Sequence, residues 1–210
     1  MHKNLELGEA LSLAPVVPVM VINNIDDAVP MAKALIAGGL KALEITLRTD
    51  CALEAVRRIS AEVTGGVVGV GTVNDADQFA EAHKAGAQFA ISPGTTDELL
   101  AAADDIPLPY LPGVATPSEA MKLRSRGYRY LKLFPAEAVG GRDLLKSIGG
   151  PLPDIKFCPT GGITPTSAPE YLALSNVVCV GGSWMLPSDL VKAGDWEAVT
   201  LLAATASELK

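Results

Sequence analysis

Two charged residues interrupt short apolar segments in a way that suggests chemistry. Lys132 lies within Leu131–Leu133, and Glu44 lies within Leu43–Ile45. Because successive side chains of a strand point to opposite faces, the aliphatic neighbours would pack against helices and both charges would face the other side of the sheet. Each charged residue comes five positions after a glycine expected to end a helix. We therefore expect the two side chains to lie at similar depth.

A lysine within a strand usually reaches solvent or belongs to an edge strand, but a closed sheet has no edge. Burial, and a nearby cation such as Arg48 on the face of Glu44 and Thr46, would favour a neutral amine that can attack a carbonyl carbon. Glu44 could transfer protons, or it could be only a buried ion-pair partner. The pair predicts a nucleophilic amine acting on a keto substrate.

Two Gly-Gly pairs predict an anion site. They lie within the segments Cys158–Gly162 and Val180–Ser183, which we expect at the ends of the last two strands. Glycine lets backbone N–H groups approach phosphate oxygens, and the loops after strands 7 and 8 often bind phosphate in (β/α)₈ barrels. Glycine also serves ordinary turns, as we expect at Gly65-Gly66 and Gly149-Gly150. The prediction therefore depends on two pairs at adjacent strand ends.

Alternating strand and helix patterns would position these residues. Expected strands begin roughly 20 to 25 residues apart. They are Val16–Ile22, Ala42–Thr46, Val67–Val70, Gln88–Ile91, Leu108–Leu111, Tyr130–Phe134, Ile155–Pro159 and Val177–Val180. Helical patterns lie between them at Asp26–Ala37, Cys51–Val63, Asp75–Lys84, Thr96–Asp104 and Pro117–Ser125.

Such alternation is typical of a closed barrel or of an open doubly wound sheet. The first strand-to-helix turn, Ile22–Asp26, lacks the glycines of a dinucleotide-binding fingerprint, and eight strands favour closure. We predict an α/β fold, a (β/α)₈ TIM barrel with an N-terminal helical segment, forming one domain over residues 1–210. A chain of this length, 49% hydrophobic, suits one packed core.

Charge and composition narrow the partners. A net charge of −7 argues against nucleic acid and anionic membranes, which attract basic surfaces. The apolar stretch Leu11–Ile22 contains prolines and is unlike a signal peptide or a membrane span. The three separated cysteines are interpreted as reduced core thiols of a cytoplasmic protein. Only His2 and His83 are present, and we expect His83 on a helix surface, so neither a metal site nor histidine catalysis is expected.

Several motifs, in order along nearly the whole chain, resemble those of the bacterial 2-keto-3-deoxy-6-phosphogluconate (KDPG) aldolase family. They are Leu43–Thr49, Gly69–Val73, Ser92–Gly94, Leu111–Pro117, Leu131–Glu137 and Pro159–Ile163. Some members also split 4-hydroxy-2-oxoglutarate, and the segment around Arg48 resembles that bifunctional branch. The resemblance implies a class I aldolase of the Entner-Doudoroff pathway that needs no cofactor and assembles as a homotrimer.

The resemblance also implies roles for individual residues. Lys132 would form the imine with the phosphorylated 2-keto acid, and Glu44 would be the general acid/base. The remaining residues would bind substrate: Arg48, Thr72 and Thr160 around the pyruvyl carboxylate, Pro93 and Phe134 as the wall, and Gly161, Gly162, Gly182 and Ser183 around the phosphate.

Two other functions remain compatible with the residues alone. A phosphosugar isomerase or epimerase would use the same barrel and phosphate loops, but it would leave an inward Lys132 unexplained. A non-catalytic phosphometabolite-binding barrel would keep the glycines but would not need a lysine and a glutamate at matching depth.

Overall fold

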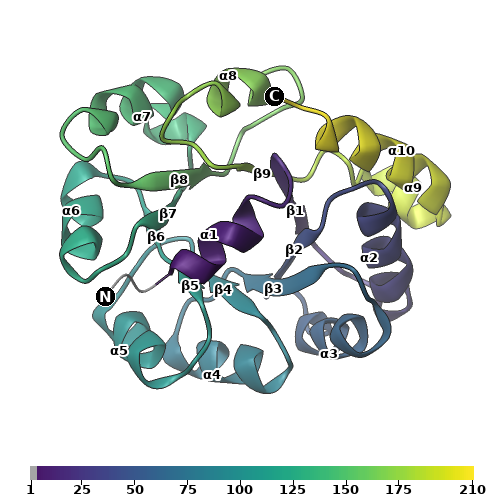
Figure 1. The fold of residues 1–210 in the computed structure, drawn as a ribbon. Helices are drawn as coiled ribbons and strands as arrows, with labels where there is room; N and C mark the ends of the chain where they lie inside the picture. The colour runs from purple at the N-terminus through teal and green to yellow at the C-terminus, as the bar shows by residue number, and fades with distance from the viewer. Residues whose placement is uncertain (1–3) are drawn as a thin grey trace.

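The computed structural model describes residues 4–210, so His2 lies outside the described part of the chain. Parallel strands surround a centre, and helices cover their outer side (Figure 1). The strands are β1 (Val16–Met20), β2 (Ala42–Thr46), β3 (Val67–Gly71), β4 (Phe89–Ile91), β5 (Tyr110–Leu111), β6 (Gly113–Val114), β7 (Tyr130–Leu133), β8 (Lys156–Pro159) and β9 (Val180–Gly182).

Helices occupy most connections between the strands. They are α1 (Leu5–Leu11), η1 (Ile25–Asp27), α2 (Ala28–Ala37), α3 (Ala52–Glu62), α4 (Ala76–Lys84), α5 (Asp97–Asp105), α6 (Pro117–Ser125), η2 (Glu137–Val139), α7 (Gly141–Gly149), α8 (Ala168–Leu172), α9 (Ser188–Ala193) and α10 (Trp196–Ser207). The five helices expected from the sequence are present, and α1 is the expected N-terminal helical segment.

Local signals explain the helix boundaries. The side chains of Asp75 and Thr96 accept hydrogen bonds from backbone N–H groups in the first turns of α4 and α5. Gly39, Gly86 and Gly127 adopt positive φ angles after α2, α4 and α6, the conformation in which glycine commonly ends a helix. His83 is exposed on α4, as expected.

The strands form a curled, parallel α/β sheet. Six are paired in the order β5-β4-β3-β2-β1-β9, and three in the order β6-β7-β8. Only Pro112 separates β5 from β6, and an isolated bridge between Thr160 and Gly181 joins the end of β8 to β9. The pairings place Glu44 beside Val19 of β1 and Lys132 beside Gly113 of β6.

Three strand predictions differ from the structure by two residues or more at a strand end, whereas the other five agree within one residue. The expected strand Leu108–Leu111 begins only at Tyr110, and β6 follows it unexpectedly because Pro112 has no N–H group and divides the pairing. The expected strand Val177–Val180 is instead Val180–Gly182, which includes two glycines of low strand propensity. The first strand ends at Met20 rather than Ile22.

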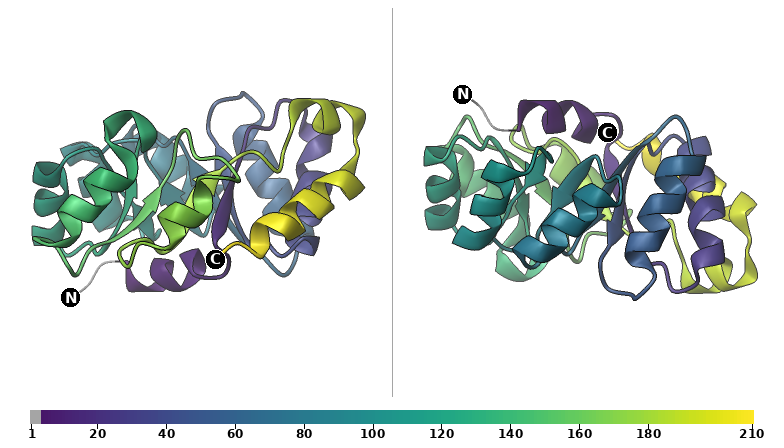
Figure 2. Two further views of the ribbon diagram at one scale, coloured as in Figure 1. Left: turned by 90° about the horizontal axis from the view of Figure 1, so that it is seen from above. Right: turned by 90° about the horizontal axis from the view of Figure 1, so that it is seen from below.

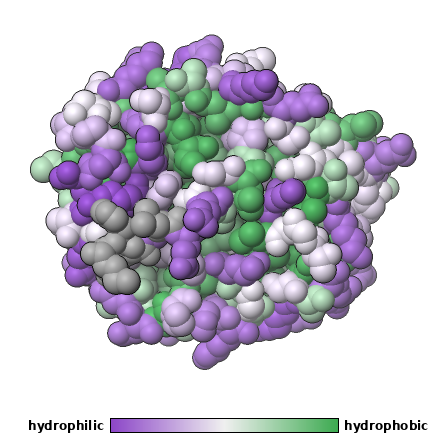
Figure 3. Space-filling model, viewed as in Figure 1, coloured by the Kyte–Doolittle hydropathy of each residue, from purple (hydrophilic) through white to green (hydrophobic). Residues whose placement is uncertain are grey.

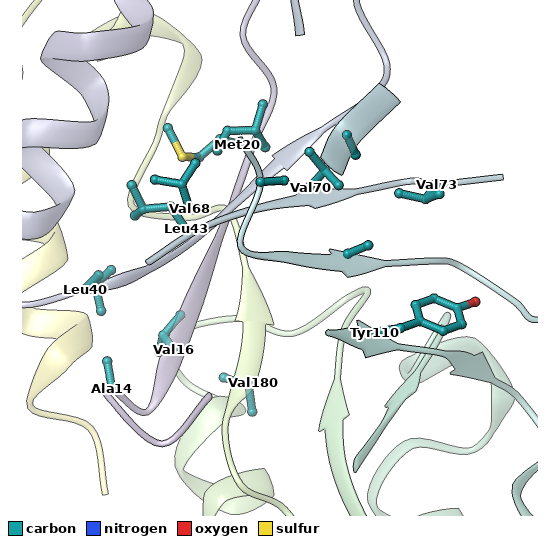
Figure 4. Packing of buried hydrophobic residues seen from close by; sticks show 14 of the residues in the cluster. Ala14, Val16, Met20, Leu40, Leu43, Val68, Val70, Val73, Tyr110 and Val180 are labelled. Atoms are coloured by element: carbon teal, nitrogen blue, oxygen red, sulfur yellow. The ribbon is translucent and has the colours of Figure 1, made fainter. Parts of the chain in front are cut away.

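Buried apolar side chains form two clusters. The larger lies between strands and helices and includes Val16, Leu43 and Val68 (Figure 4). The smaller contains the following side chains: Leu7, Leu11, Val17, Ala42, Phe89, Ile91, Leu111, Cys158 and Cys179. Cys158 and Cys179 are thus free core thiols, as expected, whereas Cys51 is free but only half-buried.

Helix α1 covers the end of the sheet at which the strands begin (Figures 1 and 2). The amide of Asn4 donates to the carbonyls of Tyr110 and Tyr130, and its oxygen accepts from the N–H groups of Arg129 and Tyr130. A space-filling view of this face shows apolar residues among hydrophilic ones (Figure 3). The covered end leaves the opposite end, where the strands finish, for a functional site.

Candidate active site

Lys132 of β7 and Glu44 of β2 form a buried ion pair. The Nζ atom of Lys132 lies 3.0 Å from Oε1 of Glu44. The two residues are 5% and 2% exposed. The two side chains thus meet, as the predicted similar depth requires, although 88 positions separate the residues in sequence. Burying two charges is costly unless each compensates the other, so the two side chains depend on each other in the folded protein.

Alternation along β2 and β7 explains the placement of the pair. Leu43 and Ile45 on β2, and Leu131 and Leu133 on β7, are fully buried in the cluster that packs against helices. The charged side chains consequently point to the other face of the curled sheet.

Gly71, at the end of β3, gives the carboxylate its space. A Cβ atom at this position would overlap Oε1 of Glu44. Gly71 was not identified from the sequence as a functional residue. The sequence did offer a signal, because the two glycines of Gly69-Val70-Gly71 share one face of the strand. The side chain that needs this space, however, is that of Glu44 on a different strand.

Phe134 lies on another side of the amine. Nζ of Lys132 is 5.4 Å from the centroid of the Phe134 ring, within the range of a cation–π contact. The ring is half-buried and also lines a cavity. The amine therefore has a proton acceptor as one neighbour and an apolar wall as another.

This cavity, of about 150 Å³, brings together residues from β1 and β9 and from the segments that follow β2, β7 and β8. Its lining residues are Val19, Arg48, Phe134, Thr160, Gly161, Gly162, Ile163, Gly181, Gly182 and Ser183. Seven of the predicted site residues are among them. Val19, Ile163 and Gly181 are additional. A Cβ atom on Gly181 would overlap Oγ1 of Thr160, so this glycine makes room for a buried hydroxyl in the site.

The two glycines after β8 have backbone conformations that glycine adopts more readily than other residues. The φ angles are 104° at Gly161 and 80° at Gly162, in the region that side chains with a Cβ rarely occupy. Such a loop can direct successive N–H groups at an anion. This part of the predicted phosphate site therefore has a suitable backbone shape.

Arg48 is placed differently from the prediction. It was expected on the inward face with Glu44 and Thr46, but β2 ends at Thr46 and the N–H of Arg48 turns back to the Thr46 carbonyl at 2.8 Å. The alternation therefore stops before Arg48, which lies exposed at the cavity. Thr46 remains buried, and its hydroxyl donates to the Met20 carbonyl.

Thr72 holds Arg48 at this position. Nε of Arg48 donates to Oγ1 of Thr72 at 3.3 Å. The φ angle of Thr72 is 62°, an uncommon and strained conformation for a β-branched residue. The strain fixes a hydroxyl beside a guanidinium at the strand end. Such an arrangement can bind a carboxylate.

Pro93 lies outside the cavity lining, in the connection after β4. A Cβ atom on Gly113, the neighbour of Lys132 in β6, would overlap the Pro93 carbonyl group. Pro93 therefore packs closely against β6, the strand that pairs with β7, which carries Lys132. The structure does not join it to the ten lining residues.

Other features bear on the chemical setting. Contact with Cys158, then burial, raises the pKa of the Cys179 thiol well above its usual value, so this core thiol is neutral. Among residues 4–210, no group of three or more histidine, cysteine, aspartate and glutamate side chains could hold a metal ion. No helix in the described part of the chain has the length and apolar character to cross a membrane.

Comparisons with known proteins agree with this geometry. The family model for KDPG and KHG aldolase matches residues 7–202. A KHG/KDPG aldolase of Escherichia coli K12 is 52% identical, over 94% of this chain and 93% of its own. A 2-dehydro-3-deoxy-phosphogluconate aldolase of Pseudomonas aeruginosa PAO1 is 53% identical, over 93% of this chain and 89% of its own.

Solved structures show the same fold. KDPG aldolase of Legionella pneumophila, with pyruvate captured as a covalent carbinolamine, superposes with a TM-score of 0.93 at 46% identity, covering 96% of this chain and 98% of its own. The enzyme of Zymomonas mobilis ZM4 with 3-phosphoglycerate also gives a TM-score of 0.93, at 47% identity, covering 98% of this chain and 96% of its own.

Proposed function

Because this chain belongs to the KDPG and KHG aldolase family, we propose that it is a class I aldolase that cleaves 2-keto-3-deoxy-6-phosphogluconate to pyruvate and glyceraldehyde 3-phosphate. The observation that carries the proposal is the buried ion pair of Lys132 and Glu44 next to Phe134 of the cavity wall. A phosphosugar isomerase or a non-catalytic binding barrel would not need a buried pair of lysine and glutamate.

Imine formation is the first chemical step. Lys132 transfers a proton to Glu44, and its neutral amine attacks the C2 ketone to form a carbinolamine. Protonation of the carbinolamine hydroxyl, with Glu44 as the acid, releases water and leaves a protonated imine. The 3.0 Å separation lets one carboxylate serve both proton transfers.

Cleavage of the C3–C4 bond follows. Glu44, directly or through one water, accepts the proton of the C4 hydroxyl. The electron pair of the C3–C4 bond passes to C3, forming an enamine with the imine as electron sink, and glyceraldehyde 3-phosphate leaves. Glu44 then returns a proton to C3, and hydrolysis of the resulting imine releases pyruvate and regenerates Lys132.

The remaining residues bind the two anionic ends of the substrate. Arg48, Thr72 and Thr160 receive the pyruvyl carboxylate, supported by the Arg48–Thr72 hydrogen bond. Gly161, Gly162, Gly182 and Ser183 bind the phosphate through backbone N–H groups and a hydroxyl, supported by the positive φ angles after β8. Phe134 forms the apolar wall next to the amine. Pro93, which lies outside the cavity lining, contributes only through its packing against Gly113 of β6.

Cleavage of 4-hydroxy-2-oxoglutarate to pyruvate and glyoxylate is a second proposed activity. The E. coli relative is named for both reactions. In the site proposed here, the lysine and the residues that receive the carboxylate are different residues from those that bind the phosphate. A keto acid without phosphate could therefore react at Lys132 but would lose the contacts at those loops.

The fold and assembly are also part of the proposal. The strands would form one closed (β/α)₈ barrel in a single domain, supported by the continuity of β5 and β6 through Pro112 and by the Thr160–Gly181 bridge. The family resemblance supports a homotrimer, and the free cysteines are compatible with the cytoplasm. Light scattering should then give a mass about three times that of the 21.8 kDa chain.

A direct assay tests the proposed reaction. The purified protein is incubated with KDPG, and pyruvate is measured by its reduction with lactate dehydrogenase. Lys132→Met should lower kcat by about a thousand-fold or more because no amine remains to form the imine. Lys156→Met is the matched control, since Lys156 lies on neighbouring β8 and its amine donates to the carbonyl of Ser175, a residue that follows α8. Absence of pyruvate with the unmodified protein, or full activity of Lys132→Met, would refute the proposal.

A further inference from the structure

Three segments meet at one place: the glycine loop that follows β8, the connection after β7 and helix α8. The N–H of Ala136 donates to the Thr160 carbonyl at 2.8 Å, and the N–H of Glu137 donates to the Gly161 carbonyl at 3.2 Å. The connection after β7, which begins at Phe134, is therefore hydrogen-bonded along the start of the glycine loop. Helix α8, which comes after that loop, supplies the third segment through Tyr171.

The side chain of Glu137 is held by Tyr171. The Tyr171 hydroxyl donates to Oε1 of Glu137 at 2.7 Å. Tyr171 is fully buried, and burial, followed by its bond to Glu137, raises the pKa of its hydroxyl far above the ordinary value. The hydroxyl consequently remains a donor across neutral and mildly alkaline pH. Gly141 leaves it room, because a Cβ atom there would lie 2.6 Å from the hydroxyl oxygen.

The methylene groups of Glu137 cover one face of Gly162. A Cβ atom on Gly162 would lie 2.7 Å from Cγ and 2.8 Å from Cβ of Glu137. Glu137 therefore contacts the loop twice, through its backbone N–H at Gly161 and through its methylenes at Gly162. The carboxylate itself is directed to Tyr171.

A negative charge next to a phosphate loop opposes anion binding, so charge alone gives no reason for an acid here. We propose that Glu137, fixed by Tyr171, is a positioning residue that holds the Gly161-Gly162 loop in the conformation that binds the substrate phosphate. This inference rests on the proposed function. A loop held in its binding conformation loses less conformational freedom when the ligand arrives, so the device acts on affinity rather than on the covalent steps.

Electrostatics and positioning give opposite expectations for Glu137→Ala. If the carboxylate acted only through its charge, its removal would tighten phosphate binding. If the side chain positions the loop, its removal should raise the KM for KDPG about tenfold while kcat changes less than about threefold, as expected for a lost part of the phosphate contacts. Glu137→Gln keeps the methylenes and an acceptor for Tyr171, and it should stay within about threefold of the unmodified KM.

The experiment compares these variants and Tyr171→Phe in three measurements. They are KM and kcat for KDPG, competitive inhibition by inorganic phosphate, and the pyruvate concentration that half-saturates borohydride trapping. Glu137→Ala and Tyr171→Phe should weaken the binding of KDPG and of inorganic phosphate by about the same factor. The pyruvate concentration that half-saturates trapping should stay unchanged. Glu170→Ala is the matched control, an exposed acid on α8 that pairs with Arg142 and should change none of the three values.

The outcomes separate this inference from the proposed function. Trapping and KDPG cleavage by the unmodified protein, with no rise in KM or even a fall for Glu137→Ala, would overturn the positioning role alone. An equal loss of pyruvate trapping would also overturn it, because the effect would then extend beyond the phosphate. If the unmodified protein neither traps pyruvate nor cleaves KDPG, the proposed function fails, and this inference fails with it.

Discussion

Removing one member of the buried ion pair should destabilise the protein far more than removing both. At 3.0 Å, two unit charges attract by about 5.5 kcal/mol when the effective dielectric constant is about 20. Lys132→Met would leave Glu44, only 2% exposed, without its partner. Breaking a buried pair in this way typically costs about 3 to 5 kcal/mol, whereas replacing both members by apolar residues is often neutral or stabilising.

The assay is a double-mutant cycle with Lys132→Met, Glu44→Leu and the combined variant, measured by urea unfolding at one fixed protein concentration. Each single variant should lose about 3 kcal/mol or more, and the double variant should recover most of it. In thermal unfolding, each single change should lower Tm by roughly 10 °C. Additive effects below about 1 kcal/mol would show that the two groups are not paired in solution and would refute the reasoning.

Three further predictions concern Glu44 as the acid/base, the space that Gly71 leaves for it, and the stability of the protein at alkaline pH. Glu44→Gln should slow KDPG cleavage about 10²- to 10⁴-fold while pyruvate trapping by borohydride persists; unchanged turnover would remove its assigned role. Gly71→Ala should displace the Glu44 carboxylate and lower kcat, whereas Gly150→Ala, where a Cβ atom meets nothing within 4 Å, should not; equal kcat values would contradict this steric reason. Burial raises the pKa of Tyr128 and of Tyr171 above 10.0, so the unfolded chain loses these protons at lower pH than the folded chain. The free energy of unfolding, measured by urea titration, should therefore fall as pH rises past about 10. A flat profile would refute this expectation.

The parts of the site that the sequence predicted correctly lie within regular strands. Lys132 and Glu44 both belong to strands that keep their alternation, so counting from the preceding glycines gave their depth. Arg48 was placed wrongly because β2 ends two residues earlier and the chain turns. Alternation predicts direction only as long as the strand continues.

Other features depend on contacts between distant segments. The steric need for Gly71 and Gly181 comes from Glu44 and Thr160, on other strands. The contact of Glu137 with Tyr171 likewise joins two connections that no local pattern relates. Local propensity also misplaced β9, since its glycines disfavour a strand and only pairing with β1 makes them one. Such contacts become visible only after the chain has folded.

Borohydride trapping tests the central claim most directly. The protein is mixed with pyruvate, reduced with borohydride, digested and analysed by peptide mass spectrometry, with Lys132→Met and Lys156→Met treated in parallel. The expected result is one pyruvate-derived modification per chain at Lys132, absent from Lys132→Met and retained in Lys156→Met. A protein that remains unmodified, or that is labelled at another lysine, would contradict imine formation at Lys132.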